Sequence, residues 1–147
     1  MKKIVIVILL VALSVFTGWY YIRHPIGTTV TINNTVFTVD VAITPKEKEV
    51  GLGFRNSLAQ DHGMLFVYTN KERFPFWMRN MHFPIDILWI DDRTIVDISK
   101  NVPASDKPVN QLPIYHPTTP VDKVLELPAG TVDRVGIVIG DKVVIKS

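Results

Sequence analysis

The chain begins with one long apolar run and then changes to alternating apolar and polar positions. Residues 4–22 carry no charged side chain, and twelve of these nineteen positions are Ile, Leu, Val or Phe. A helix of that length spans roughly 28 Å, close to the hydrocarbon thickness of about 30 Å in a bilayer. The pattern predicts a membrane anchor over residues 1–24, formed by one N-terminal transmembrane helix, and a single domain over residues 25–147.

The charges beside this run predict its orientation. Lys2 and Lys3 precede the run, and only Arg23 closely follows it. By the positive-inside rule, the N terminus stays in the cytoplasm and the domain lies outside. The alternative is a cleaved signal peptide, with a small-residue cleavage pattern at residues 12–14, which would release a secreted domain. Such a leader would be short, so we favour a single-pass anchor, and the domain is exported in both cases.

Alternation after residue 27 predicts strands. In residues 35–43, every second side chain from Phe37 onward is apolar, as in a strand with one buried face. An Asn-Asn turn joins it to a preceding strand at residues 29–32, so a hairpin opens the domain. Thr44-Pro45-Lys46-Glu47 then has the pattern of a capping box and predicts a short helix toward Leu52.

The remaining patterns predict a β-rich domain. Strand-like runs occur at residues 64–68, 74–81, 84–91, 94–99, 124–127 and 142–145, with a short helix before Gly136. Closely spaced strands favour an antiparallel sheet that curls on itself. The predicted fold class is α+β and β-rich: a curled antiparallel sheet or partly open barrel with one or two short helices, preceded by the transmembrane helix.

A proline-rich segment interrupts the strands. Residues 101–120 contain five prolines, too many missing N–H donors for a central strand or a helix. The segment is predicted to be a long ordered loop and a candidate lid over a site. The alternative is a surface crossover that prolines stiffen.

Composition and charge narrow the possible functions. Cysteine is absent, which excludes disulfides, thiolate metal ligands and an acylated cysteine. The net charge is +2, and removing Lys2 and Lys3 leaves equal numbers of basic and acidic residues. A neutral domain lacks the electrostatic footprint of a nucleic-acid binder, so no nucleic-acid partner is predicted.

Polar and aromatic candidates gather around the predicted strand at residues 74–81. Trp77 and Arg79 share one face of that strand, and a short connection brings Arg79 or Asn80 near Asp86. Arg55 could approach them from the end of the helix. We therefore predict one concave polar-aromatic pocket, partly covered by the proline-rich loop and bordered by Arg55, Trp77, Arg79, Asn80 and Asp86.

Asp86 has two interpretations. A carboxylate among apolar neighbours needs a partner, so an ion pair between Asp86 and an arginine could simply stabilise the fold. Alternatively, the cluster is a binding site in which Trp77 offers a stacking surface for sugars or for aromatic or cationic ligands.

The sequence gives little support for a bound metal ion or a cofactor. His62 and His82, with Asp61 or Asp86, offer suitable donor atoms but lack the spacing of a metal motif, so no metal site is predicted. The sequence has no Gly-x-Ser-x-Gly, P-loop or HExxH motif and no cysteine nucleophile. No cofactor is predicted, and no catalytic residue can be assigned.

Several motifs in register resemble the family called domain of unknown function 192, from about Thr38 to Val144. These motifs are Gly51-Leu52-Gly53-Phe54-Arg55, Gly63-Met64-Leu65-Phe66, Phe76-Trp77-Met78-Arg79-Asn80, Pro84-Ile85-Asp86, Leu125-Glu126-Leu127-Pro128-Ala129-Gly130 and Gly140-Asp141. The resemblance implies a compact β-rich domain that is often exported or membrane-attached, and it implies no reaction, substrate or cofactor. Met81 departs from the family pattern, which usually has Thr there.

These observations favour an anchored binding or accessory module for an envelope ligand or a partner protein. The alternative is a hydrolase-like envelope enzyme with a polar site around Asp86 and Arg55. A shallow apolar groove would favour the module, whereas a raised pKa of Asp86 in an open cleft would favour the enzyme.

Overall fold

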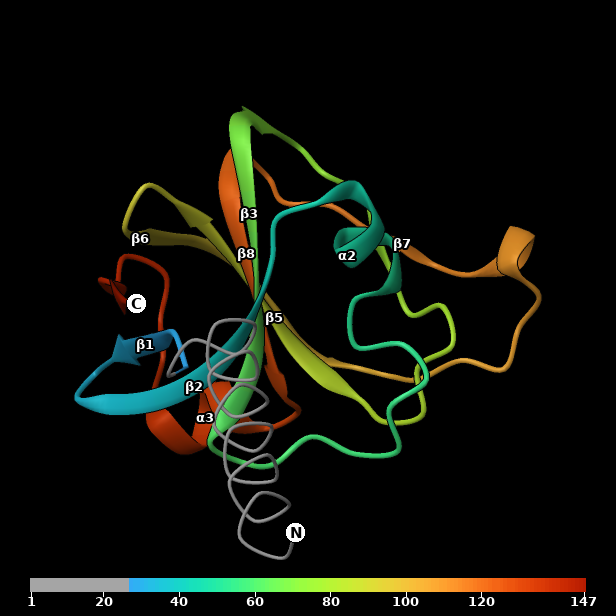
Figure 1. Ribbon diagram of the computed structural model, residues 1–147, viewed down its shortest axis with the longest axis horizontal. Coiled ribbons are helices and arrows are strands. Elements are labelled where there is room, and N and C mark those ends of the chain that lie inside the picture. Colours follow the sequence, from blue (N-terminus) through green and yellow to red (C-terminus); the bar gives the residue numbers. More distant parts are fainter. Residues whose placement is uncertain (1–26) are drawn as a thin grey trace, which may run out of the picture.

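A seven-stranded mixed sheet forms the body of residues 27–147, the part of the chain that this computed structural model describes (Figure 1). In sheet order, the strands are β6 (Thr94–Val102), β5 (Ile85–Asp91), β8 (Val121–Pro128), β3 (His62–Glu72), β2 (Thr35–Ala42), β1 (Thr29–Ile32) and β9 (Val144–Lys146). A separate ribbon pairs β4 (Phe76–Trp77) with β7 (Ile114–Tyr115). The helical elements are α2 (Pro45–Val50), α3 (Thr131–Val135) and the 3-10 turn η1 (Val109–Gln111).

The predicted transmembrane helix within residues 4–22 lies outside the described residues. Within residues 27–147, the longest helix is α2, with six residues. No helix in this part of the chain combines the length and apolar character needed to cross a bilayer.

The sheet curls until its two ends approach each other. Next to the first residues of β6, the Gly140 N–H donates to the Ile95 carbonyl at 2.8 Å, and the Ile95 N–H donates to the Asp141 carbonyl at 3.0 Å. A bridge between Thr94 and Lys142 continues this contact. Figure 1 shows the C-terminal segment in red beside β6 and β1. The predicted β-rich, partly open barrel with short helices is confirmed.

One strand pair differs from the predicted antiparallel sheet, because β2 and β3 run parallel. Their register places Val39 beside Gly63 and Val41 beside Leu65. A parallel pair needs a crossover of about a dozen residues or more, and residues 43–61, which include α2, provide it. Alternation looks the same in either strand direction, so the apolar pattern could not distinguish the two arrangements.

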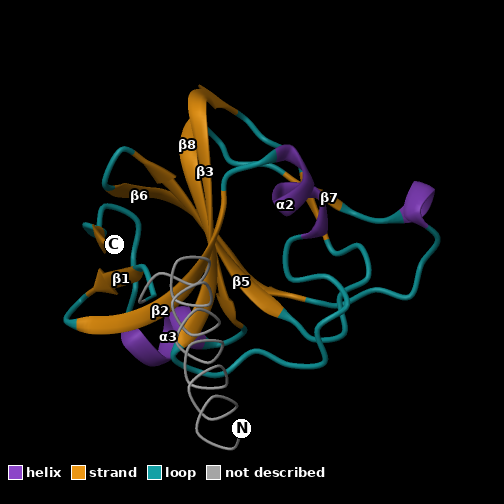
Figure 2. Ribbon diagram, in the orientation of Figure 1, coloured by secondary structure: helices purple, strands orange, loops and turns teal. Residues whose placement is uncertain are grey.

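Two cores lie on opposite faces of the sheet, and the central strands contribute to both. Leu65, Leu88 and Leu125 belong to the core that includes Val132 of α3, here called the α3-side core. Their chain neighbours Phe66, Ile87 and Val124 belong to the other, here called the α2-side core. Besides the sheet, loops and short elements build the α2-side core, including Leu52, Phe76, Met78 and Met81 (Figure 2).

Two local predictions near the start of the domain are confirmed. The β1–β2 hairpin turns at Asn33 and Asn34, which both have positive φ angles, at 48° and 63°. At α2, the Glu47 N–H donates to the Thr44 hydroxyl at 3.3 Å, and the Thr44 N–H donates to the Glu47 carboxylate at 2.9 Å. These bonds form the predicted capping box and lower the pKa of Glu47.

The strand predicted at residues 74–81 is a correction, because only Phe76–Trp77 forms a strand. Beyond Trp77 the chain turns, with a bond from the Met81 N–H to the Met78 carbonyl at 3.4 Å. Asn80 has a φ of 56°, far from the extended conformation of a regular strand, and Asn tolerates such an angle better than most residues. A local left-handed turn therefore overrides the apolar alternation.

Asp86 is a fully buried carboxylate that joins three elements. Its Oδ1 accepts a bond from the Asn101 N–H at 2.8 Å, at the end of β6. Its Oδ2 accepts a bond from the Val132 N–H at 2.8 Å, in the first turn of α3. No side chain of the N-cap residue, Gly130, can bond this helix start, so the capping group comes from β5. The predicted pair between Asp86 and an arginine is not formed.

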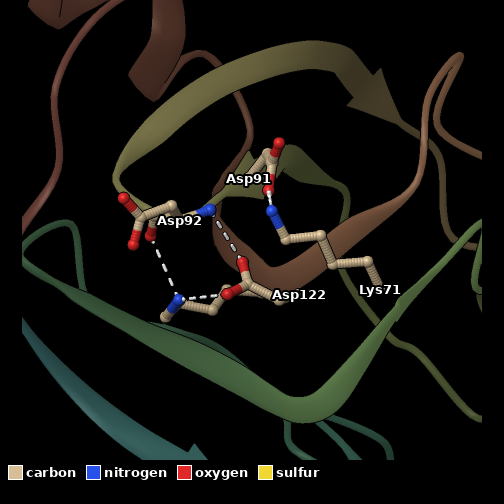
Figure 3. Close-up of polar contacts among 5 residues, drawn as sticks. Lys71, Asp91, Asp92 and Asp122 are labelled. Atoms are coloured by element: carbon tan, nitrogen blue, oxygen red, sulfur yellow. Dashed lines mark hydrogen bonds and ion pairs between the residues drawn. The ribbon is translucent and has the colours of Figure 1, made fainter.

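A second polar network surrounds the β5–β6 turn at the other end of β5 (Figure 3). The Lys71 ammonium lies 2.5 Å from the Asp91 carboxylate. The Asp92 N–H donates to Asp122 at 2.9 Å, and Lys123 pairs with the other Asp122 oxygen at 2.8 Å. Lys123 also donates to the Asp92 carbonyl at 3.0 Å, so these contacts connect the end of β5 and the turn to β3 and β8 and stabilise this end of the sheet.

The capping role of Asp86 predicts a large stability loss for Asp86→Asn. The amide would keep one acceptor and turn an NH2 group toward a buried N–H donor, at a cost of about 2 to 4 kcal/mol. Chemical unfolding measures the loss. Asp133→Asn is the matched control, because Asp133 also lies in the first turn of α3 but is exposed and paired with Lys100. Equal, small effects of the two substitutions would contradict the capping role.

Candidate functional site

A cavity lies between the α2-side face of the sheet, α2 and β4. Its volume is about 80 Å³, on a scale where one water needs about 10–15 Å³. The cavity therefore has room for a group of a few heavy atoms. It is lined by Lys48, Glu49, Val50, Gly51, Leu52, Phe66, Tyr68, Pro75, Phe76, Trp77, Arg79, Met81 and Glu126.

Glu126 forms the polar part of the sheet side of this cavity. It lies on the central strand β8, between Met64 of β3 and Ile87 of β5. Only 6% of the residue is exposed. Gly63 allows β3 to approach β8 here, because a Cβ atom at that position would lie 2.7 Å from the Glu126 carbonyl oxygen. The carboxyl group is therefore held by a closely paired, rigid part of the sheet.

Burial controls the charge of Glu126. Loss of solvation raises its pKa to about 8, and the positive charge of Arg55 opposes that rise only in part. No hydrogen bond from the described residues stabilises the carboxylate. Near pH 7 the group is therefore mainly protonated, and it is a buried acid with no partner of its own.

Aromatic rings make up much of the remaining wall. Phe66 and Phe76 meet edge to face at 4.9 Å between ring centroids, and Phe76 packs in the same way against Trp89 at 5.3 Å. Burial and the nearby Glu126 raise the pKa of Tyr68 to about 12, so its hydroxyl stays protonated. The result is a fixed aromatic wall beside the buried carboxyl group of Glu126.

The charged groups around the cavity are largely compensated by one another. Arg79 lies 3.8 Å from Glu49 at the rim. Arg55 pairs with Asp40 at 2.8 Å, beside the cavity rather than in its lining. The Lys48 ammonium lies 4.1 Å from the centroid of the Tyr68 ring, in cation–π contact.

The structure separates the five predicted site residues. Trp77 and Arg79 line the cavity, and Arg55 influences it only through its charge. Asn80 lies in the adjacent turn, where its carbonyl accepts the Phe54 N–H at 2.8 Å. Asp86 points to the opposite face of the sheet, toward Val132, so it borders no common pocket with Trp77.

Glu126 was absent from the predicted site, although the sequence contains a signal for it. The residue lies between Leu125 and Leu127, in a run of apolar residues typical of a strand buried on both faces. A carboxyl group at such a position must find a partner, remain protonated or serve a function. That signal could have been used without any structure.

The proline-rich loop supports the cavity from outside. Its β7 strand pairs with β4, placing Ile114 beside Trp77 and Tyr115 beside Phe76. No residue of the loop lines the cavity. The loop therefore positions the aromatic wall, and the predicted lid over the site is not observed in this conformation.

The described part of the chain contains no candidate metal site. Within residues 27–147, no group of three or more His, Cys, Asp or Glu side chains is arranged to hold a metal ion. His62 instead bonds its neighbour Asp61 at 2.8 Å, and the bond lowers the pKa of Asp61.

Comparisons with known proteins agree with this architecture. The solved structure of a Sinorhizobium meliloti 1021 protein, described provisionally as a transcription regulator, is 36% identical, with a TM-score of 0.70 over 80% of this chain and 91% of that protein. A protein of unknown function from Novosphingobium aromaticivorans is 34% identical, with a TM-score of 0.71 over 79% and 83%. No match is found among the curated proteins. The family domain of unknown function 192, described as "Uncharacterized ACR", matches residues 28–145, and the chain belongs to this family.

Proposed function

We propose that the domain is an extracytoplasmic binding module for an envelope ligand and that the cavity beside Glu126 is its ligand site. The observation that supports this most directly is a buried carboxyl group without a hydrogen-bond partner, facing a cavity with aromatic walls. Aromatic and apolar side chains around a few well-placed polar groups are typical of small-ligand sites. A buried acid without a partner also costs stability, which a structural role would not require.

The residues that surround Glu126 favour binding over catalysis. A general acid or base needs a second reacting group, such as a nucleophile or a group that stabilises developing charge. Among the residues that line the cavity, Glu49 is near Arg79 and Tyr68 stays protonated. The hydrolase-like alternative around Asp86 and Arg55 loses support, because Asp86 uses both oxygens to bond backbone amides.

The location follows from the sequence of the first 24 residues. The uncharged apolar run and the two lysines before it support a single-pass anchor with the domain outside. The domain's balanced charge offers no basic surface for nucleic acid. We therefore do not extend the description of the Sinorhizobium meliloti protein to this chain.

Membrane fractionation tests the anchor. The full chain should stay with the membrane during carbonate extraction, because the apolar run is long enough to span the bilayer. A chain beginning at Gly27 should appear in the soluble fraction. A released mature protein that starts near residue 15 would show that the leader is cleaved and that the domain is secreted.

The buried acid predicts a pH-dependent stability. The pKa of Glu126 is about 8 in the folded protein and 4.5 in the unfolded chain. Its contribution to the free energy of unfolding is therefore fully present below about pH 4.5. It is lost as the pH rises toward 8, by an amount on the order of 4 kcal/mol. Glu126→Gln removes this titration, so the variant should gain stability relative to the unmodified protein between pH 5 and pH 9.

Denaturant titrations at pH 5 and at pH 9 measure the stability of Glu126→Gln relative to the unmodified protein. Glu49→Gln is the matched control, because Glu49 lines the same cavity but is solvent-exposed. A constant difference between Glu126→Gln and the unmodified protein across this range would mean that Glu126 ionises normally.

A panel of three small probes tests the site itself: tetramethylammonium, acetate and glucose. With the full chain in a non-ionic detergent micelle, at least one probe should shift the NMR signals of the Trp77 indole N–H and the Met81 methyl group. The Ile95 methyl signals should stay unchanged, because Ile95 belongs to the α3-side core. If no probe shifts the cavity signals, the proposed ligand site is wrong.

A further inference from the structure

We propose that the cavity binds a methylated ammonium group, with the Glu126 carboxylate as its counter-ion and the aromatic side chains as its cage. This inference rests on the proposed function and names the chemical class of its ligand. The chemistry is the same whether the group belongs to a free small molecule or to a lipid headgroup.

The first support is that the buried carboxyl group of Glu126 lacks a hydrogen-bond partner among the described residues. The residue is 6% exposed and has no hydrogen-bond partner among residues 27–147. A cation placed beside it would compensate the charge that burial now suppresses. An anionic ligand would instead keep the group protonated, and the two basic side chains of the lining already lie over Tyr68 and near Glu49.

The second support is the shape and chemistry of the wall. Phe66, Tyr68, Phe76 and Trp77 all line the cavity, and Trp77 keeps 43% of its surface exposed. Rings around a carboxylate are the arrangement that holds quaternary ammonium ligands through cation–π attraction. The volume of about 80 Å³ suits a compact group of a few heavy atoms.

The third support is a cationic side chain that already lies at the mouth of the cavity. The Lys48 ammonium lies over the Tyr68 ring at 4.1 Å, which shows that this wall attracts positive charge. Of the other cations nearby, Arg55 is neutralised by Asp40 and Arg79 lies near Glu49. Lys48 and Arg79 are the basic side chains of the lining, and Lys48 is the one that lies over an aromatic ring and would compete with a cationic ligand for it.

The scarcity of acceptors distinguishes a methylated ammonium from a primary one. A primary ammonium carries three N–H donors, each of which needs an acceptor once buried. The side-chain acceptors of the lining are the Glu126 carboxyl, the Tyr68 hydroxyl and, near Arg79, the Glu49 carboxylate, and most of the other lining residues are apolar or aromatic. A methylated ammonium needs no such set of bonds and matches an apolar cage.

Binding in this site is coupled to one proton. The carboxylic acid of Glu126 gives up its proton to solvent when the cation arrives, and no bond to carbon changes. The charged groups that face Glu126 from the surrounding elements affect that release and are Lys48 and Glu49 of α2, Arg55 with its partner Asp40, Tyr68 of β3 and Arg79 after β4. Affinity should therefore rise about tenfold from pH 6 to pH 7 and level off above pH 8.

The deciding experiment compares choline with 3,3-dimethyl-1-butanol, its uncharged carbon isostere. The full chain in a non-ionic detergent is titrated with each probe, and the Trp77 indole and Met81 methyl signals give the dissociation constants. Choline should bind about tenfold more tightly than the isostere at pH 8. A pH electrode in weakly buffered solution should detect release of about one proton per bound choline at pH 7.

Two variants locate the effect. Glu126→Gln should remove both the preference for choline and the proton release, and its unchanged Ile95 methyl signals verify the fold. Lys48→Gln should tighten choline binding several-fold, because it removes the competing ammonium. Glycerophosphocholine separates the sources: binding as tight as that of choline favours a lipid headgroup, whereas weaker binding favours a free ligand.

The outcomes also separate this inference from the proposed function. If the isostere binds as tightly as choline, or if acetate binds in place of both, the cavity is a ligand site and the ammonium proposal is wrong. If neither these probes nor glucose shifts the cavity signals, both the ammonium proposal and the proposed ligand site are wrong.

Discussion

The contact between Asp86 and two backbone amides is the constraint on which the barrel depends. Through it, β5 bonds the end of the neighbouring edge strand β6 and the first turn of α3. α3 has only five residues, too few to be stable alone, and its N-cap residue is a glycine. The carboxylate therefore supplies both the cap and the attachment of this helix, and Val132 then completes the α3-side core.

Two buried carboxyl groups on neighbouring central strands have opposite roles. Asp86 and Glu126 are close in register, since Asp86 pairs with Leu127 and Ile87 pairs with Glu126, but their side chains point to opposite faces. Asp86 has an amide donor for each oxygen, whereas burial without a hydrogen bond raises the pKa of Glu126. The first arrangement stabilises the fold, and the second retains an unused capacity for a partner.

Local patterns were sufficient for parts of the fold, and long-range pairing was not readable from them. The capping box at Thr44 and the Asn33-Asn34 hairpin depend on a few adjacent residues, so both were predicted correctly. The parallel pairing of β2 with β3 depends on a crossover that alternation does not encode. For the site, alternation grouped Trp77 with Arg79, and both side chains line the cavity. Asp86 was assigned to it because alternation groups side chains by face without identifying what covers each face.

The two faces of the sheet differ in packing, and under the proposed function one serves stability and the other recognition. The α3-side core is a continuous set of aliphatic side chains around Phe37, closed by the barrel seam. The α2-side face is covered by a six-residue helix and the two-residue strands β4 and β7, and here a buried acid and a cavity interrupt the packing. A fold breaks its own packing rules mainly where function requires it. Asp86 bonds on the α3 side and lines no part of the cavity, so the cap of α3 does not use the residues that surround Glu126.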